Sequence, residues 1–116
     1  MPKFMILMQE NDHAWSRLAP EEQQRLLEKY YAWARELKEK DFMRGGDALS
    51  DGGRELRVVG GDVVDAPYTE TKEVVTGYFL IEAPDLEAAA QIARGCPALG
   101  HGETVLVRRT GHHSED

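Results

Sequence analysis

The segment RVVGGDVVDAPYTETKEVVTGYFLIEA, residues 57–83, decides the fold of this chain because it contains a turn between two extended runs and then a long strand. Gly60-Gly61 separates two valine-rich runs, and adjacent glycines that can both take positive φ predict a tight β-hairpin turn. Pro67 ends the second run, since proline has no N–H to donate to a neighbouring strand. After a charged stretch, Thr76–Ala83 alternates large apolar residues between two faces and is the most strand-like run of the chain.

Two more strands and one helix are predicted on the N-terminal side of this segment. Lys3–Gln9 is short and apolar on both faces, and Phe42–Leu49 is extended but contains Gly45-Gly46, where we expect a bulge. Between these runs, the apolar spacing predicts a helix from Pro20 to about Lys40, because proline suits the first helical position. The predicted apolar stripe of this helix is Leu26, Leu27, Tyr30, Tyr31, Ala34 and Leu37.

The C-terminal side repeats the helix-then-strand pattern. Asp85 is a good N-cap for a short helix, which Gly95-Cys96-Pro97 ends, and Glu103–Thr110 is the last strand. The order β-α-β-hairpin-β-α-β predicts the α+β class, with a ferredoxin-like sandwich whose antiparallel sheet carries both helices on one face. The predicted buried stripe of the second helix is Leu86, Ala89, Ala90 and Ala93.

The strands are apolar on both faces, although two helices can cover only one face of a sheet. The residues concerned, or their alternates along each strand, are Met5, Leu7, Tyr78, Leu80, Val105 and Val107. An apolar sheet face left in water would forfeit many kcal/mol, and a large exposed apolar patch normally marks an interaction surface. We therefore predict a homodimer that packs sheet against sheet.

Composition restricts the classes of partner. The chain has 116 residues and 41% hydrophobic residues, which predicts one domain over residues 1–116 with an ordered core at about 3–110. Its formal charge of −7 argues against nucleic-acid binding, and its apolar runs are too short to span a membrane.

With a single cysteine, Cys96, and no signal-peptide pattern, a cytoplasmic location is expected. We see no metal-ligand spacing and no cofactor motif, and expect neither metal nor cofactor.

Residues 65–73 also carry a family resemblance. Asp65-Ala66-Pro67-Tyr68 followed by TETKE resembles the DGPF signature of the YCII-related proteins, which usually reads Asp-Gly-Pro-Phe-x-Glu-x-Lys-Glu. Ala66 stands in place of the usual glycine, and Tyr68 in place of phenylalanine. The likeness extends over about Lys3–Arg109 and implies a dimeric ferredoxin-like α+β barrel, similar in fold to muconolactone isomerase. It also implies a link to regulation by extracytoplasmic-function sigma factors.

The resemblance does not supply an active site. In the shorter branch of the family a histidine–aspartate pair is proposed as the active site, and its histidine lies in the first helix. Tyr30 occupies that position in our overlay, so the pair is not carried over to this chain.

Four candidate site residues allow two interpretations each. Asp65 could cap the turn or face a ligand as an acid–base group, and His101, between two glycines in a flexible loop, could be solvated or transfer a proton. Glu70 and Lys72 lie on one strand face, either as an ion-paired surface motif or as contacts for an anionic ligand. The other candidate ligand contacts are Arg44 and Arg57, for an anion, and Tyr30 and Trp33, for which a core role is favoured over a pocket-lining one.

Two functions remain open at this point. The first is a small dimeric module that binds a small anionic or aromatic ligand, or a protein partner. The alternative is a cofactor-free enzyme that transfers a proton or isomerises a ring, which rests on analogy of fold alone. The binding module is favoured because no residue pair in the sequence has the arrangement of an acid–base pair. A closed pocket with an unpaired carboxylate or imidazole would favour the enzyme.

Overall fold

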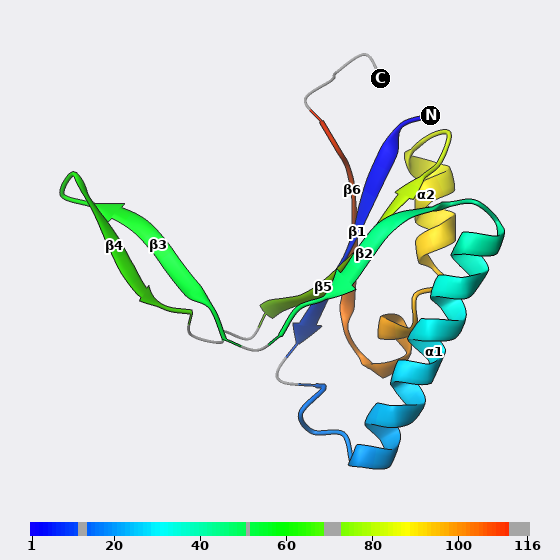
Figure 1. The fold of residues 1–116 in the computed structure, drawn as a ribbon, viewed down its shortest axis with the longest axis horizontal. Helices are drawn as coiled ribbons and strands as arrows, with labels where there is room; N and C mark the ends of the chain where they lie inside the picture. The colour runs from blue at the N-terminus through cyan, green and yellow to red at the C-terminus, as the bar shows by residue number, and fades with distance from the viewer. Residues whose placement is uncertain (12–13, 51, 69–72, 112–116) are drawn as a thin grey trace.

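The chain forms a four-stranded antiparallel sheet, two α-helices and a separate β-hairpin (Figure 1). The computed structural model describes residues 1–11, 14–50, 52–68 and 73–111. The elements are β1 (Lys3–Asn11), α1 (Pro20–Glu39), β2 (Met43–Ala48), β3 (Arg54–Val59), β4 (Asp62–Pro67), β5 (Glu73–Glu82), α2 (Leu86–Ala93), the 3₁₀ helix η1 (Pro97–His101) and β6 (Thr104–Arg109). The predicted order of elements is confirmed, although β5 begins at Glu73 rather than at Thr76.

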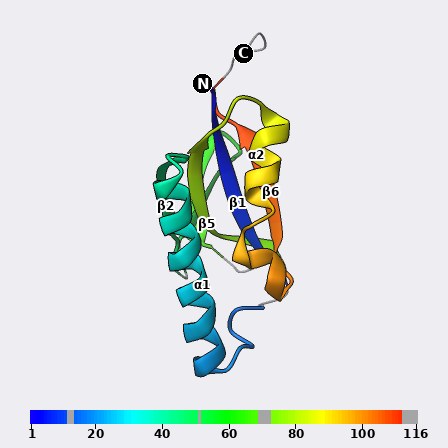
Figure 2. The same ribbon diagram turned by 90° about the vertical axis from the view of Figure 1, so that its right-hand side faces the viewer.

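The sheet has the strand order β2-β5-β1-β6, and every neighbouring pair is antiparallel. Both helices lie on one face of this sheet, as Figures 1 and 2 show. This arrangement is compatible with the predicted ferredoxin-like α+β fold. The expected bulge in β2 is confirmed, because the pairing of β2 with β5 shifts register between Met43 and Gly45.

The core lies between the sheet and the helices. Alternation along β1 turns Phe4, Ile6 and Met8 toward the helices, where all three are buried. On α1, Trp33 is buried and its ring meets the ring of Phe79 edge-on, with centroids 4.9 Å apart and an interplanar angle of 75°. The core role predicted for Trp33 is therefore confirmed.

Parts of both predicted helix stripes are wrong. On α1 the buried line runs through Leu26, Trp33 and Leu37, and Tyr31 is 61% exposed because it lies beyond the edge of that line. On α2 the side facing the sheet is centred on Ala89 and Ala93. Two predicted α2 stripe residues, Leu86 and Ala90, are consequently exposed.

Helix α1 begins without a side-chain cap, and Ala19→Ser is expected to stabilise the protein by about 1 kcal/mol. Ala19 occupies the N-cap with an extended backbone, and its N–H already donates to Glu22 Oε1 at 3.1 Å. A serine hydroxyl would accept from the N–H of Glu22 and complete the reciprocal capping box. Urea denaturation measures the effect, with Ala32→Ser in the exposed middle of α1 as the control that should not stabilise. An unchanged or lowered free energy of unfolding for Ala19→Ser would contradict this prediction.

Residues Arg54–Pro67 form the predicted hairpin, which we call the arm. Gly60 and Gly61 have φ of 59° and 87°, as the predicted tight turn requires. In the described part of the chain the arm pairs with no other strand, and it projects from the helix-free side of the sheet (Figure 1). The radius of gyration is accordingly 16.2 Å. A compact chain of this length would have about 13 Å.

The helix-free face of the sheet carries the apolar residues that the two-faced strands predict. Leu7 lies opposite Tyr78 of β5 and Leu106 of β6, and Met5 lies opposite Leu80. Leu106 is 40% exposed, and the other four are half-buried. We call these five residues the open face. On β6, Val105 and Val107 face the helices and pack against the core, so their alternate Leu106 is the β6 residue on the open face. No described helix is both long enough and apolar enough to cross a membrane.

Candidate functional site

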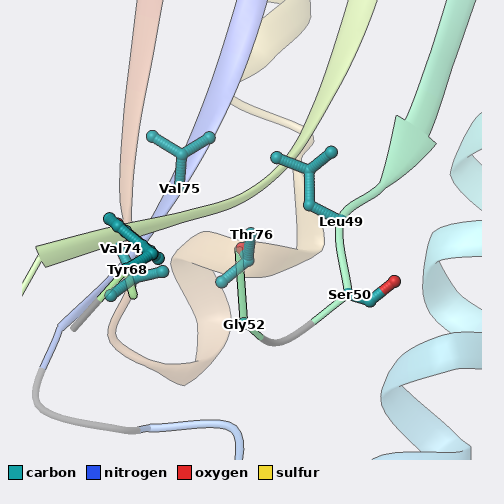
Figure 3. Close-up of a pocket in the computed structure, with 7 residues that line it drawn as sticks. All are labelled: Leu49, Ser50, Gly52, Tyr68, Val74, Val75 and Thr76. Carbon is teal, nitrogen blue, oxygen red and sulfur yellow. The ribbon is translucent and has the colours of Figure 1, made fainter. Parts of the chain in front are cut away.

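A pocket of about 340 Å³ lies where the arm meets the sheet (Figure 3). Its wall comes from three segments: the chain after β2, the end of the arm and the start of β5. Two backbone hydrogen bonds hold these segments together, from Tyr68 N–H to Gly53 O and from Leu49 N–H to Thr76 O, each at 2.9 Å. The lining residues are Leu49, Ser50, Gly52, Tyr68, Val74, Val75 and Thr76.

A bulge in β5 turns one wall residue toward the interior. Met8 lies opposite Gly77 and Gln9 opposite Val75, so Thr76 is the extra residue of the pairing between β1 and β5. A bulge changes the direction of the side chain at its extra residue. The Thr76 hydroxyl donates to Glu103 Oε1 at 3.0 Å and lies 3.4 Å from Met8 O. Thr76 therefore connects the pocket wall with a buried carboxylate.

Glu103 and His101 form a buried acid–imidazole contact beside Thr76. Their side chains are 4% and 11% exposed, and Glu103 Oε2 contacts His101 Nε2 at ion-pair distance. Both imidazole nitrogens are buried, and neither makes a hydrogen bond of normal geometry within the described residues. The sequence prediction of a flexible loop at His101 is wrong, because His101 ends the 3₁₀ helix η1 and its ring packs inward.

The turn between His101 and β6 is held by local contacts. Gly102 has φ of 87°, which lets the chain reverse direction after η1. The Glu103 N–H then donates to Ala98 O at 3.1 Å. From the end of β1, the Asn11 amide donates to Gly102 O at 3.1 Å and to Thr104 Oγ1 at 3.0 Å. These bonds hold the backbone around Glu103 in place, directly before the start of β6.

Burial and the charge of Glu103 also raise the pKa values of two nearby groups, the Tyr30 phenol and the Cys96 thiol. Burial, and after it the charge of Glu103, raise the pKa of the Tyr30 phenol well above its usual range. Burial, with a smaller contribution from Glu103, raises the pKa of Cys96 to about 11. Both groups therefore stay protonated at neutral pH, so Cys96 is no thiolate nucleophile there, and the Tyr30 hydroxyl can donate or accept a hydrogen bond but carries no charge.

The charged candidates on the arm and at the sheet edge lie apart from this cluster. Asp65 is within β4 rather than in a turn, and its carboxylate accepts from Arg54 at 2.7 Å. Arg57 Nε lies 3.0 Å from Glu55 Oε1, also on the exposed arm. The arm's predicted acid–base and anion-binding residues thus already have partners of opposite charge.

Of four other predicted contacts, Arg44 and Trp33 lie elsewhere and two are not described. Arg44 Nε donates to Glu82 Oε2 at 2.6 Å, at the end of β5 far from Thr76. Trp33, beyond its core role, lines a groove of about 320 Å³ between α1 and α2. Glu70 and Lys72 lie outside the described residues, although in sequence they fall between Tyr68 and Val74 of the pocket wall.

Sequence reasoning missed Glu103 and Thr76. A signal for Glu103 existed, since alternation places it on the same strand face as Val105 and Val107, and an acid on a buried face is unusual. No sequence signal could identify Thr76, because its direction depends on the bulge. Within the described residues, no three His, Cys, Asp or Glu side chains are grouped as metal ligands would be.

Comparison with known proteins tests the resemblance seen in residues 65–73. No curated protein matches the sequence. The family model of the YCII-related domain matches residues 2–109, which is nearly the whole chain and includes the arm, the pocket and the Glu103–His101 contact. The chain therefore belongs to the YCII-related domain family.

Proposed function

We propose that this protein is a homodimeric domain that binds a small molecule in the pocket at the root of the arm. The observation that carries the proposal is the pocket wall itself. It is largely apolar, and among its lining residues the polar side chains are the hydroxyls of Ser50, Tyr68 and Thr76. Its volume of about 340 Å³ suits a small ligand. A partly aromatic molecule with a carbonyl or hydroxyl group fits this wall best.

Lys72 extends the proposal to anionic ligands. Lys72 follows Tyr68 closely in sequence and lies outside the described residues, and it stays our predicted contact for an anionic ligand. A small aromatic acid combines a ring for the apolar wall with a carboxylate for such a contact.

The open face supports the homodimer. Its five residues are aliphatic or aromatic, and both described helices lie on the opposite face of the sheet. A two-fold arrangement would bury the same face of each copy against the other. Sheets packed in this way lie about 10 Å apart, with side chains of both copies interdigitated.

An enzymatic role is the second candidate, and the Glu103–His101 contact favours it. A ligand in the pocket touches Thr76, whose hydroxyl could pass a proton to Glu103 at 3.0 Å. Binding is nonetheless better supported than chemistry, because both nitrogens of His101 are buried away from the pocket. We also propose that ligand binding by this domain takes part in regulation with sigma factors. This part of the proposal is supported by the family resemblance alone.

A thermal-shift screen against small aromatic acids, lactones and neutral aromatic metabolites tests the binding proposal. A ligand at a hundred times its dissociation constant stabilises the native state by ~2.7 kcal/mol and visibly raises the melting temperature. Tyr68→Ala, which removes one wall of the pocket, should weaken such a ligand by roughly tenfold or more. Tyr31→Ala is the matched control, since Tyr31 is 61% exposed on α1 and lines no part of the pocket.

The same ligand separates binding from catalysis. Incubation in D₂O, followed by NMR, reports whether an acidic C–H of the ligand exchanges faster with protein present. Exchange that disappears in Glu103→Gln would support the enzyme. Binding without exchange would support the module, and a panel without any ligand would contradict the small-molecule proposal.

A further inference from the structure

One side of the arm carries three exposed apolar residues toward its tip, and the Arg54–Asp65 ion pair lies on the same side nearer the root. In its register Val58 lies opposite Val63 and Leu56 opposite Asp65, so these side chains share one side of the hairpin. Leu56, Val58 and Val63 are 62%, 71% and 69% exposed. The other side is mixed, because Val59 and Val64 alternate there with Glu55, Arg57 and Asp62.

Nothing in the described part of the chain covers the apolar side of the arm. The arm is a two-stranded sheet of its own, with no pairing to the four-stranded sheet. Isolated two-stranded hairpins are marginally stable in water, and stability normally requires another strand or a packed face. An arm with this composition therefore needs a surface to pack on.

The direction and area of the arm identify a second copy as that surface. The arm projects from the helix-free side of the sheet, the side that the proposed homodimer uses (Figure 1). Four strands spaced about 4.8 Å apart, with lengths of about 20–25 Å, offer a face of roughly 400–500 Å². A standard interface needs about 800 Å² from each partner, which the open face does not provide alone. The arm adds a further face of roughly 200 Å² on the same side, which brings the total to roughly 600–700 Å² and closer to that requirement.

We infer that the arm of each protomer packs its apolar side, formed by Leu56, Val58 and Val63, on a second copy of this chain, and that this contact controls the ligand pocket. The inference rests on the proposed homodimer. Gly52 and Tyr68 of the pocket wall lie at the root of the arm, whereas Val75 and Thr76 belong to the sheet. A change in the angle between arm and sheet would therefore change the shape of the pocket. Ligand binding and dimer formation should then strengthen each other, as linkage requires.

Val58→Asp and Val59→Asp are a matched pair for the test. The two valines are adjacent near the tip and are 71% and 57% exposed, but they lie on opposite sides of the arm. Sedimentation equilibrium should show that Val58→Asp weakens the dimer by roughly tenfold or more, because a carboxylate would be buried in the contact. Val59→Asp should change the dimer much less. Val63→Asp, on the same side as Val58, should repeat the effect of Val58→Asp.

Hydrogen exchange gives an independent readout of the arm. In the wild-type dimer the amides of Arg54–Val59 and Asp62–Ala66 should be protected, and dilution to monomer or Val58→Asp should remove that protection. Fast exchange of these amides in the intact dimer, or equal effects of Val58→Asp and Val59→Asp, would overturn the arm contact while leaving the homodimer in place. A monomeric wild-type protein at micromolar concentration would overturn the homodimer and the arm contact together.

Discussion

Leu7→Asp is expected to convert the proposed homodimer into folded monomers, with the association weakened by roughly a hundredfold or more. Leu7 lies on β1 at the middle of the open face, between Tyr78 and Leu106 on the neighbouring strands. In a sheet-against-sheet dimer an aspartate at this position would be buried without a partner charge. In the monomer the same carboxylate would remain half-exposed to water, so the fold should survive.

Light scattering measures the mass, and circular dichroism confirms the fold. Leu86→Asp is the matched control, because Leu86 is 56% exposed at the start of α2, on the helix side of the sheet. If Leu7→Asp proves unstable, Leu106→Asp on the edge strand β6 makes the same test at a more exposed position. An unchanged dimer mass in the folded open-face variants would exclude packing through this face.

Glu103→Ala is expected to lower the free energy of unfolding by about 3 kcal/mol, because each buried polar group left unpaired costs roughly 1–3 kcal/mol. The change would remove the nearer acceptor of the Thr76 hydroxyl and the only carboxylate in contact with His101 among the described residues. It would also leave a cavity beside η1. For a domain of this size the melting temperature should fall by roughly 10–15 °C.

Two further variants separate the contributions to this loss. Glu103→Gln keeps the volume and an oxygen for Thr76, so it should lose clearly less stability than Glu103→Ala. Thr76→Val removes only the hydroxyl, and its effect on stability should be about 1 kcal/mol. If Glu103→Ala and Glu103→Gln both have the free energy of unfolding of the wild type, the Glu103 carboxylate does not stabilise the structure around the pocket.

Ion pairing on the arm explains why Asp65 and Arg57, two candidates from the sequence, lie apart from the proposed pocket. Asp65 and Arg57 belong to a motif-bearing hairpin, but there they pair with Arg54 and Glu55 on an exposed arm. The pocket instead uses neutral residues at the root of that arm, with a buried acid behind them. His101 stays a predicted site residue, and the structure adds that its side chain is buried against Glu103.

Local chemistry in the sequence determined the elements of this protein. Gly60-Gly61 could form only a tight turn between two extended runs, and Pro20 and Asp85 mark the helix starts that are observed. Apolar alternation in β1 and β5 was enough to show that both sheet faces are apolar. These features depend on backbone preferences and on residues close together in the chain, so they can be read without the fold.

Only the tertiary structure decided how distant residues meet. Thr76 reaches Glu103 because a bulge shifts the register of β1 against β5, and that shift depends on long-range pairing. The tertiary structure also placed Tyr30 and Cys96 close enough to Glu103 for its charge to act on their pKa values. The sequence likewise did not show that the arm pairs with no other described strand. Contacts between residues far apart in sequence depend on register and burial, and neither is encoded in any single segment.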